Sequence, residues 1–142
     1  MTALTPEEYL SQAIPADRRI RRKLDRLADL YADCTRSTAV LSLTPGGGHD
    51  GRAFENRMEK YLLLREEINA DIDNYVGLKT EIQSVIDTLP DETWRYVLEK
   101  HFLQGKSYSE IGDEMGYHKN TIGKIAKKAL ANLKIPKLAD ES

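Results

Sequence analysis

Residues 91–136, DETWRYVLEKHFLQGKSYSEIGDEMGYHKNTIGKIAKKALANLKIP, decide the fold of this 142-residue chain. Their first apolar residues recur at helical spacing until Gly105, a residue that readily ends a helix. Ser107 with Glu110 three residues later is the capping-box pattern that begins a helix. The segment therefore predicts three short helices, the last two over about 108–115 and 119–133.

Three positions predict how the last two helices cross. Gly112 places a small residue in the middle of the first of them, where a second helix must approach closely. Gly116, four residues later, can adopt the left-handed conformation that opens the turn. Ile122, six residues further on, supplies a branched apolar side chain at the crossing. This spacing is typical of a helix-turn-helix, whereas a glycine in the loop of an ordinary three-helix bundle is the alternative.

The same segment resembles the promoter-reading fourth region of bacterial sigma factors. The resemblance covers about 48 residues and rests on Leu89-Pro90, Val97-Leu98, Phe102, the run from Gly105 to Gly112, Met115-Gly116, Thr121-Ile122 and the run from Ala129 to Leu133. The layout of the whole chain is similar to phage-encoded regulators of this kind, including RinA-type late-gene activators. Gly112 stands where the family usually has alanine, and Gly123 where a larger polar residue is common.

The helix over 119–133 is expected to enter the major groove of DNA with its first turns towards the base edges. Asparagine can pair with adenine, lysine with guanine, and the threonine methyl with thymine, which assigns base reading to Lys119, Asn120, Thr121 and Lys124. Contacts with the DNA backbone are expected from Lys106, Ser107, Tyr108, Ser109, His118, Lys127 and Lys128. His118 either caps the helix or contacts a phosphate. Each lysine taken alone is equally consistent with a solvated helix face.

Two longer helices are expected before this segment. Thr5-Pro6 followed by two acids predicts a helix start, and Ile20, Leu24, Leu27 and Tyr31 mark a helix of about 18 residues. A longer helix over about 53–89 carries a stripe at alternating steps of four and three residues: Ile68, Ile72, Tyr75, Lys79, Ile82, Ile86 and Leu89. Residues 35–53 are rich in Ser, Thr and Gly and predict a flexible loop.

The sequence thus predicts an all-α chain, a long N-terminal antiparallel helical hairpin followed by a helix-turn-helix domain of sigma-region-four type. Residues 1–89 are expected to form the hairpin, which would associate through residues 5–89 into a homodimer or a higher homo-oligomer. Residues 90–136 are expected to form the DNA-binding domain and 137–142 a tail. Pro90 marks the boundary, because the residue before a proline is disfavoured in a helix.

Composition excludes several other classes of protein. Net charge is −2, and no apolar run is long enough to cross a membrane. The single cysteine, Cys34, excludes a disulfide framework within one chain and a multi-cysteine zinc site. The glycines of residues 46–51 lack the Lys-Ser/Thr pair of a phosphate-binding loop. With no nucleophile–base pair or metal-ligand spacing, we expect no enzyme activity, no cofactor and no metal ion.

The leading prediction is a sequence-specific DNA-binding transcriptional regulator of phage or mobile-element type. Its expected partner is double-stranded DNA, and its expected location is the cytoplasm of a bacterial host, in association with the nucleoid. Two alternatives stay open: a sigma-like factor that engages RNA polymerase, and an accessory protein of DNA packaging or recombination. A ring-sized oligomer would favour packaging, and a dimer on a palindromic site would favour regulation.

Overall fold

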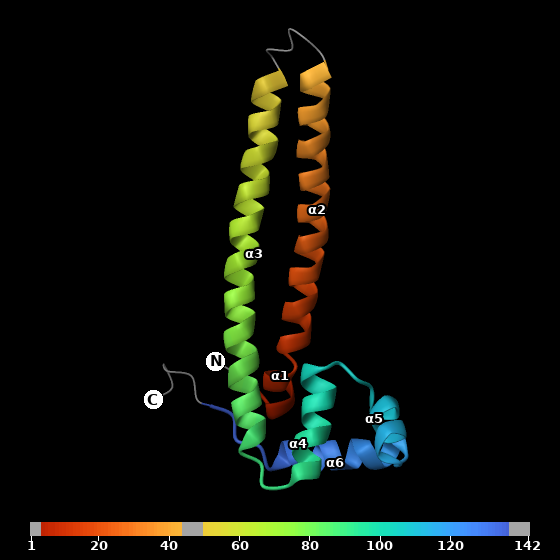
Figure 1. Cartoon of the computed structure of the whole chain (residues 1–142). Helices are drawn as coiled ribbons and strands as arrows, with labels where there is room; N and C mark the ends of the chain where they lie inside the picture. The colour runs from red at the N-terminus through yellow and green to blue at the C-terminus, as the bar shows by residue number, and fades with distance from the viewer. Residues whose placement is uncertain (1–3, 44–49, 137–142) are drawn as a thin grey trace. The chain divides into compact units, whose positions relative to one another are not determined.

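The computed structural model describes residues 4–43 and 50–136, and these residues form helices with no strand (Figure 1). The all-α class, with an antiparallel hairpin and a C-terminal helix-turn-helix, is confirmed. The helices, in chain order, are α1 (Pro6–Leu10), α2 (Ala13–Leu43), α3 (Asp50–Asp87), α4 (Glu92–Leu98), the π-helix η1 (Glu99–Leu103), α5 (Tyr108–Met115) and α6 (Lys119–Ala131).

The chain divides into two compact units, which differ from the division expected near residue 90. One unit, here called the composite unit, takes residues up to Ala16 together with those from Tyr75 onward. The other, the hairpin unit, is Asp17–Asn74. The start of the chain and the last turns of α3 therefore belong with the helix-turn-helix. The role of residues 5–89 in association stays a prediction.

The composite unit has a single apolar core. Residues of α1 and of the last turns of α3 pack there with α4, η1, α5 and α6 (Figure 1). The fully buried side chains include Leu10 from α1, Ile82 and Ile86 from α3, and Leu98 from α4. Because the core draws on α1, on the last turns of α3 and on the C-terminal helices, segments far apart in sequence hold α6 in place.

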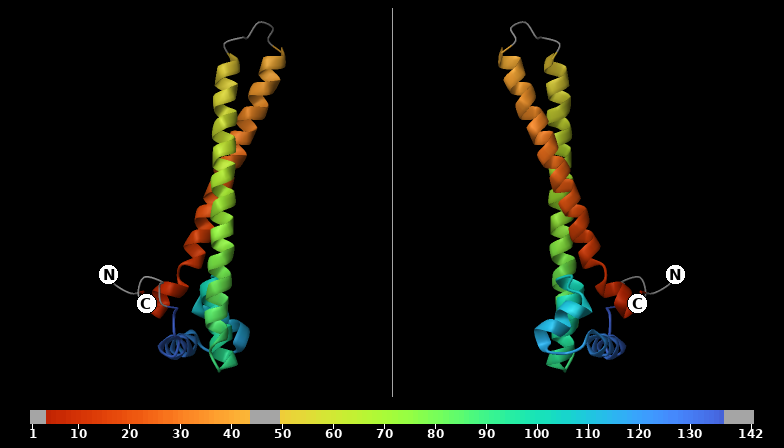
Figure 2. Two further views of the ribbon diagram at one scale, coloured as in Figure 1. Left: turned by 90° about the vertical axis from the view of Figure 1, so that its left-hand side faces the viewer. Right: turned by 90° about the vertical axis from the view of Figure 1, so that its right-hand side faces the viewer.

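In the hairpin unit, α2 and α3 run alongside each other in opposite directions (Figure 2). The Lys23 ammonium lies 2.9 Å from a Glu67 carboxylate oxygen and 2.6 Å from one of Asp71. Further along the pair, the rings of Tyr31 and Tyr61 are 5.9 Å apart. These contacts fix the antiparallel register of the hairpin that the sequence predicted.

The expected loop over 35–53 is too long. Helix α2 continues to Leu43 and α3 begins at Asp50, so residues 35–43 and 50–53 are helical. The hydroxyl of Thr35 donates to the carbonyl of Tyr31, 2.9 Å away, which satisfies a polar side chain within the helix. Serine and threonine were therefore misleading as loop signals here. The rest of that loop, 44–49, and the expected tail, 137–142, lie outside the described residues.

Other helix boundaries were predicted more closely. Thr5 caps α1, with the Glu8 amide donating to its hydroxyl at 3.1 Å, as the sequence indicated. The third helix of the C-terminal segment ends at Ala131 and not at 133. Asp91 caps α4 by accepting from the Thr93 amide at 2.8 Å.

The first helix of the C-terminal segment changes into a π-helical turn before it ends, which the sequence did not predict. A π turn holds more residues than an α turn, and so shifts which side chains face the core. The neighbouring residues Phe102 and Leu103 are both buried as a result. Gly105 follows with a φ of +74°, in the left-handed region, and confirms the expected stop.

Candidate nucleic-acid interface

The crossing of α5 and α6 depends on Gly112. A Cβ atom at this position would lie within 3.0 Å of the backbone carbonyl oxygen of Tyr117, closer than real Cβ contacts come. The Gly112 carbonyl also accepts from the amides of Gly116, at 2.8 Å, and Tyr117, at 2.9 Å. Gly116 itself has a φ of +79°. Both glycines therefore act as the sequence predicted, one at the close approach and one at the turn.

Helix α6 has one buried side and one exposed basic side. Ile122 and Ala129 are fully buried, as expected, and so is Ala126, which the sequence analysis did not single out. All of the proposed base-reading residues and two of the proposed phosphate-binding lysines are exposed: Lys119, Asn120, Thr121, Lys124, Lys127 and Lys128. Because α6 contains no acidic residue, no negative charge on this helix opposes the approach of DNA.

His118 is the N-cap of α6. Its Nδ1 atom accepts a hydrogen bond from the backbone amide of Asn120 at 3.1 Å. Of the two roles open to His118 in the sequence analysis, the structure shows the cap. Nδ1 is the acceptor in this bond, so the other ring nitrogen, Nε2, can donate towards a phosphate.

The start of α5 presents a second polar surface. The Ser107 hydroxyl oxygen accepts from the Glu110 amide at 3.1 Å, and a Glu110 carboxylate oxygen accepts from the Ser107 amide at the same distance. Hydrogen bonds from Ser107 to the carboxylate lower the pKa of Glu110, the bond from the Ser107 backbone first and that from its side chain second. The predicted capping box is thus present.

Lys106 is already engaged by an acid of the same domain. Its ammonium forms an ion pair with Glu114, whose other carboxylate oxygen accepts from the Tyr96 hydroxyl at 3.0 Å. Glu114 raises the pKa of Lys106, and Lys106, followed by Tyr96, lowers the pKa of Glu114. The sequence analysis missed Glu114, because a position seven residues beyond the capping serine carries no local signal of this pairing.

Tyr108 is held more firmly than a free surface side chain. Its ring stacks on the His101 ring with centroids 4.3 Å apart, and His101 Nδ1 lies 2.8 Å from the Lys106 carbonyl oxygen. Burial raises the pKa of the Tyr108 hydroxyl, and the charge of Glu7 adds to the effect. Ser109, by contrast, is exposed in the first turn of α5.

Gly123 has no packing requirement. A Cβ atom there would meet the Tyr108 ring at 3.8 Å, an ordinary van der Waals distance. The contacts between α5 and α6 therefore do not explain why position 123 is a glycine. This sets it apart from Gly112, where an added Cβ atom has no room.

The C-terminal part of the chain matches a known family. Residues 85–134 match the family model for sigma-70, region 4, a range that starts in the last turn of α3 and ends just after α6. This part of the chain is a sigma-region-four-like helix-turn-helix, a DNA-binding kind of domain and not a catalytic one. No curated protein and no solved structure matches the chain. Among the described residues, no helix is both long and apolar enough to cross a membrane.

Proposed function

We propose that this protein is a sequence-specific transcriptional regulator that reads the major groove with α6. One observation carries the proposal: the acid-free exposed side of α6 lies opposite a side that is buried at Ile122, Ala126 and Ala129. A helix fixed in this way can present the same side chains to every duplex it meets, which sequence-specific reading requires. The match to sigma-70 region 4 supports the same function.

In this proposal the exposed residues of the interface divide into two groups. The first turns of α6 offer Asn120 for an adenine, Lys119 or Lys124 for a guanine, and Thr121 for a thymine methyl. The phosphates are bound by Lys127 and Lys128 along α6, by His118 at its start, and by the first turn of α5 with Ser107, Tyr108 and Ser109. Lys106 joins this group once it leaves Glu114.

The chain would act as a homodimer or a higher homo-oligomer associated through residues 5–89. A single helix-turn-helix covers few base pairs and binds weakly, whereas two linked copies on neighbouring half-sites bind far more tightly. The phage or mobile-element origin proposed here rests on the similar layout of phage-encoded regulators.

The deciding experiment is the selection of bound duplexes from a random pool by the full chain, at near-physiological salt. Enrichment of one motif, with two half-sites about one helical turn apart, is the expected result. Binding that only fades with rising salt, with no enriched motif, would contradict base reading and leave backbone contact alone.

A double variant tests the assignment to α6. Asn120→Ala with Lys124→Ala is expected to lower affinity for the selected site by about 1–3 kcal/mol for each lost base contact and to relax the motif. Lys79→Ala removes an exposed lysine from α3 and serves as the matched control. Unchanged affinity and an unchanged motif in the double variant would show that α6 is not the reading helix.

A second candidate function is a sigma-like factor that engages RNA polymerase, and the family match favours it specifically. The two functions can be separated with purified components. Co-sedimentation of the full chain with RNA polymerase in the absence of DNA would support the second, whereas enrichment of a motif with no such association would support the first alone.

A further inference from the structure

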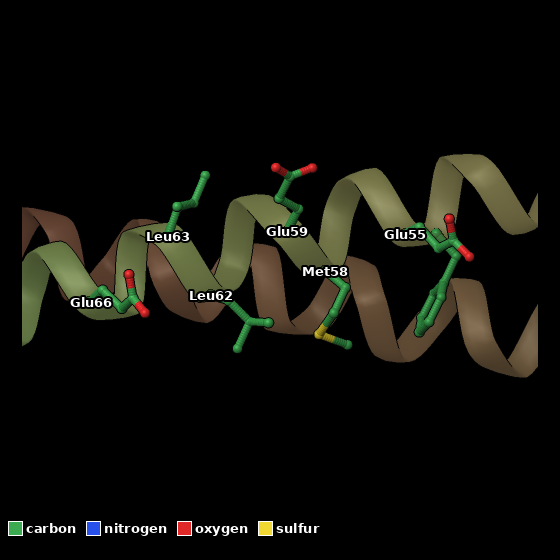
Figure 3. A pocket seen from close by; sticks show the side chains of 7 residues that line it. Glu55, Met58, Glu59, Leu62, Leu63 and Glu66 are labelled. Carbon is green, nitrogen blue, oxygen red and sulfur yellow. The ribbon is translucent and has the colours of Figure 1, made fainter.

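Helix α3 carries an apolar hollow that the DNA-binding function does not use. It lies within the hairpin unit and has a volume of about 320 Å³. Every residue that lines it comes from α3 (Figure 3). The apolar members are Phe54, Met58, Leu62 and Leu63, and the charged members are Glu55, Glu59 and Glu66. Since all three charged members are acidic, the hollow favours a partner that is apolar and basic.

Two leucines at the hollow are about half exposed to solvent, which is unfavourable unless another surface covers them. Leu62 is 47% exposed and Leu63 is 58% exposed, one turn from Met58. The described residues of the hairpin unit bury few apolar side chains: Ile20, Cys34, Leu64 and Ile68. A pair of helices with so small a core gains stability when another surface covers its remaining apolar face.

Helix α2 of the same chain has the complementary chemistry. Arg18, Arg22 and Arg26 recur at four-residue steps, so they lie along one side of the helix, and all three are exposed. No ion pair among the described residues uses them.

The lengths of the two surfaces also agree. From Arg18 to Arg26 a helix rises about 12 Å, and from Glu55 to Glu66 about 16 Å, at 1.5 Å per residue. An arginine row of this length can therefore lie along the glutamate row, with the aliphatic stems of the arginines over the apolar side chains between the glutamates.

We propose that a second copy of this chain lays the arginine side of its α2 against the acidic, apolar hollow on α3. Each chain carries one surface of each kind, so a two-fold axis would pair hollow with arginines twice and close the assembly at two copies. The proposal rests on the proposed function, because it names the surface through which the DNA-binding regulator would associate.

Charge reversal in the full chain tests this assignment. One variant is Glu55→Arg with Glu59→Arg, and the other is Arg18→Glu with Arg22→Glu. Each alone places like charges at both contacts, so its dimer dissociation constant, measured by sedimentation equilibrium, should rise at least about tenfold. An equimolar mixture of the two variants restores opposite charges at both contacts, and dimers should reappear as heterodimers.

Controls separate this effect from a general one. Asp73→Arg reverses an exposed acid on α3 outside the hollow and should leave the dimer intact. All substituted positions are exposed, so the far-ultraviolet circular dichroism of each variant should match that of the wild type. A wild-type chain that stays monomeric, reversal variants that dimerise as well as the wild type, or a mixture that does not restore dimers would each overturn the proposal.

DNA binding is measured in parallel, so that the two proposals can fail separately. The charge variants should bind a duplex with one half-site as the wild type does and lose the extra affinity for two half-sites. If the mixture restores dimers and no duplex is selected, the docking surface stands and the regulator function fails. If duplexes are selected and the reversals leave the dimer unchanged, the function stands and the docking surface fails.

Discussion

The composite unit and the hairpin unit are both built from helices, yet they bury apolar side chains very differently. In the composite unit the core collects side chains from α1, α3, α4, η1, α5 and α6, including Leu10, Ile86 and Ile111. In the hairpin unit two helices face each other, and the described buried residues are Ile20, Cys34, Leu64 and Ile68. Leu24, Tyr31, Leu62 and Leu63 stay exposed there.

The difference indicates a division of labour. A recognition helix must be held in one position to read bases, and a core that gathers distant segments provides that rigidity. A two-helix unit with exposed leucines has little stability of its own and gains from association. The first unit therefore suits DNA reading and the second suits contact with another chain. If this comparison holds, substitutions in the two units must differ in how much they lower stability and in which part of the chain they destabilise.

The largest expected effect is a cavity in the composite core. Leu98 is fully buried, so Leu98→Ala should lower the free energy of unfolding by about 2–5 kcal/mol. Urea unfolding followed by the fluorescence of Trp94 measures this, because Trp94 is the single tryptophan and packs against that core.

Ile68→Ala is the matched substitution in the hairpin unit, where Ile68 is almost fully buried. It should leave the Trp94 transition in urea nearly unchanged. The helical signal of circular dichroism should begin to fall at a lower urea concentration than in the wild type. If Ile68→Ala shifted the Trp94 transition as far as Leu98→Ala does, the two units would unfold as one and the comparison would be broken.

The next effect is smaller and concerns the crossing of α5 and α6. Gly112→Ala should lower the free energy of unfolding by about 1–3 kcal/mol, because the new Cβ atom meets the Tyr117 carbonyl and the backbone must shift. Thermal unfolding measures the loss. Gly123→Ala is the control: its Cβ atom fits at 3.8 Å from Tyr108, and alanine favours the helix by up to about 1 kcal/mol. Equal behaviour of the two variants would mean that the crossing tolerates a side chain.

The helix-turn-helix was predicted closely because its signals are local. The Ser107–Glu110 capping box, the left-handed turn at Gly116 and the small residue at Gly112 each act on neighbours within a few positions. Such signals can be read without knowledge of the rest of the fold. The residues of α6 that the sequence assigned to base reading are all exposed, and they lie in the first turns of the helix, as the sequence predicted.

What the sequence missed depends on tertiary contacts. The π turn at Glu99–Leu103 brings Phe102 and Leu103 to the core, and no periodic pattern announces such a turn. The pairing of Lys106 with Glu114 joins a residue before α5 to one near its end. In the hairpin unit, Leu24 and Tyr31 of the predicted apolar stripe remain exposed, Tyr31 even though its ring meets that of Tyr61, because a two-helix pair covers only part of such a stripe.

The capping box of α5 should contribute less than the core or the crossing. Ser107→Ala removes the acceptor for the Glu110 amide, and we expect a loss of about 1 kcal/mol in the free energy of unfolding. The Trp94 transition in urea measures it. A change of more than about 3 kcal/mol would show that Ser107 has a role beyond capping.

The same box predicts a dependence on pH. Its hydrogen bonds lower the pKa of Glu110 below the ordinary 4.5, so they favour the charged form in the folded chain. The stabilisation is complete above pH 4.5 and is lost as pH falls through the lower pKa of the folded chain. Glu110→Gln keeps a capping side chain but cannot titrate, and so should lose less stability on acidification. If the free energy of unfolding fell equally with pH in the wild type and in Glu110→Gln, this contribution of Glu110 would be contradicted.

The smallest expected effect lies in the hairpin unit and sharpens the comparison most. Lys23 joins the two helices through Glu67 and Asp71. Its hydrogen bonds to these carboxylates raise the pKa of Lys23, and the bond to Asp71 has the larger effect. The contribution is therefore present below pH 10.5 and is lost as pH rises through the higher pKa of the folded chain. Lys23→Met keeps the aliphatic stem and removes the charge, so the ion pairs alone are lost.

Because ion pairs that solvent can reach contribute little, and because Lys23 lies outside the composite core, Lys23→Met should leave the Trp94 transition unchanged. Hydrogen exchange should nevertheless become faster at amides of Asp17–Asn74, and stay unchanged at those of α4–α6, if the hairpin opens separately from the core. Arg21→Met removes an ion pair within α2 alone, with Asp17, and should leave exchange in α3 as in the wild type. Faster exchange in α4–α6 on Lys23→Met would instead mean that the recognition helix draws its rigidity from the hairpin as well.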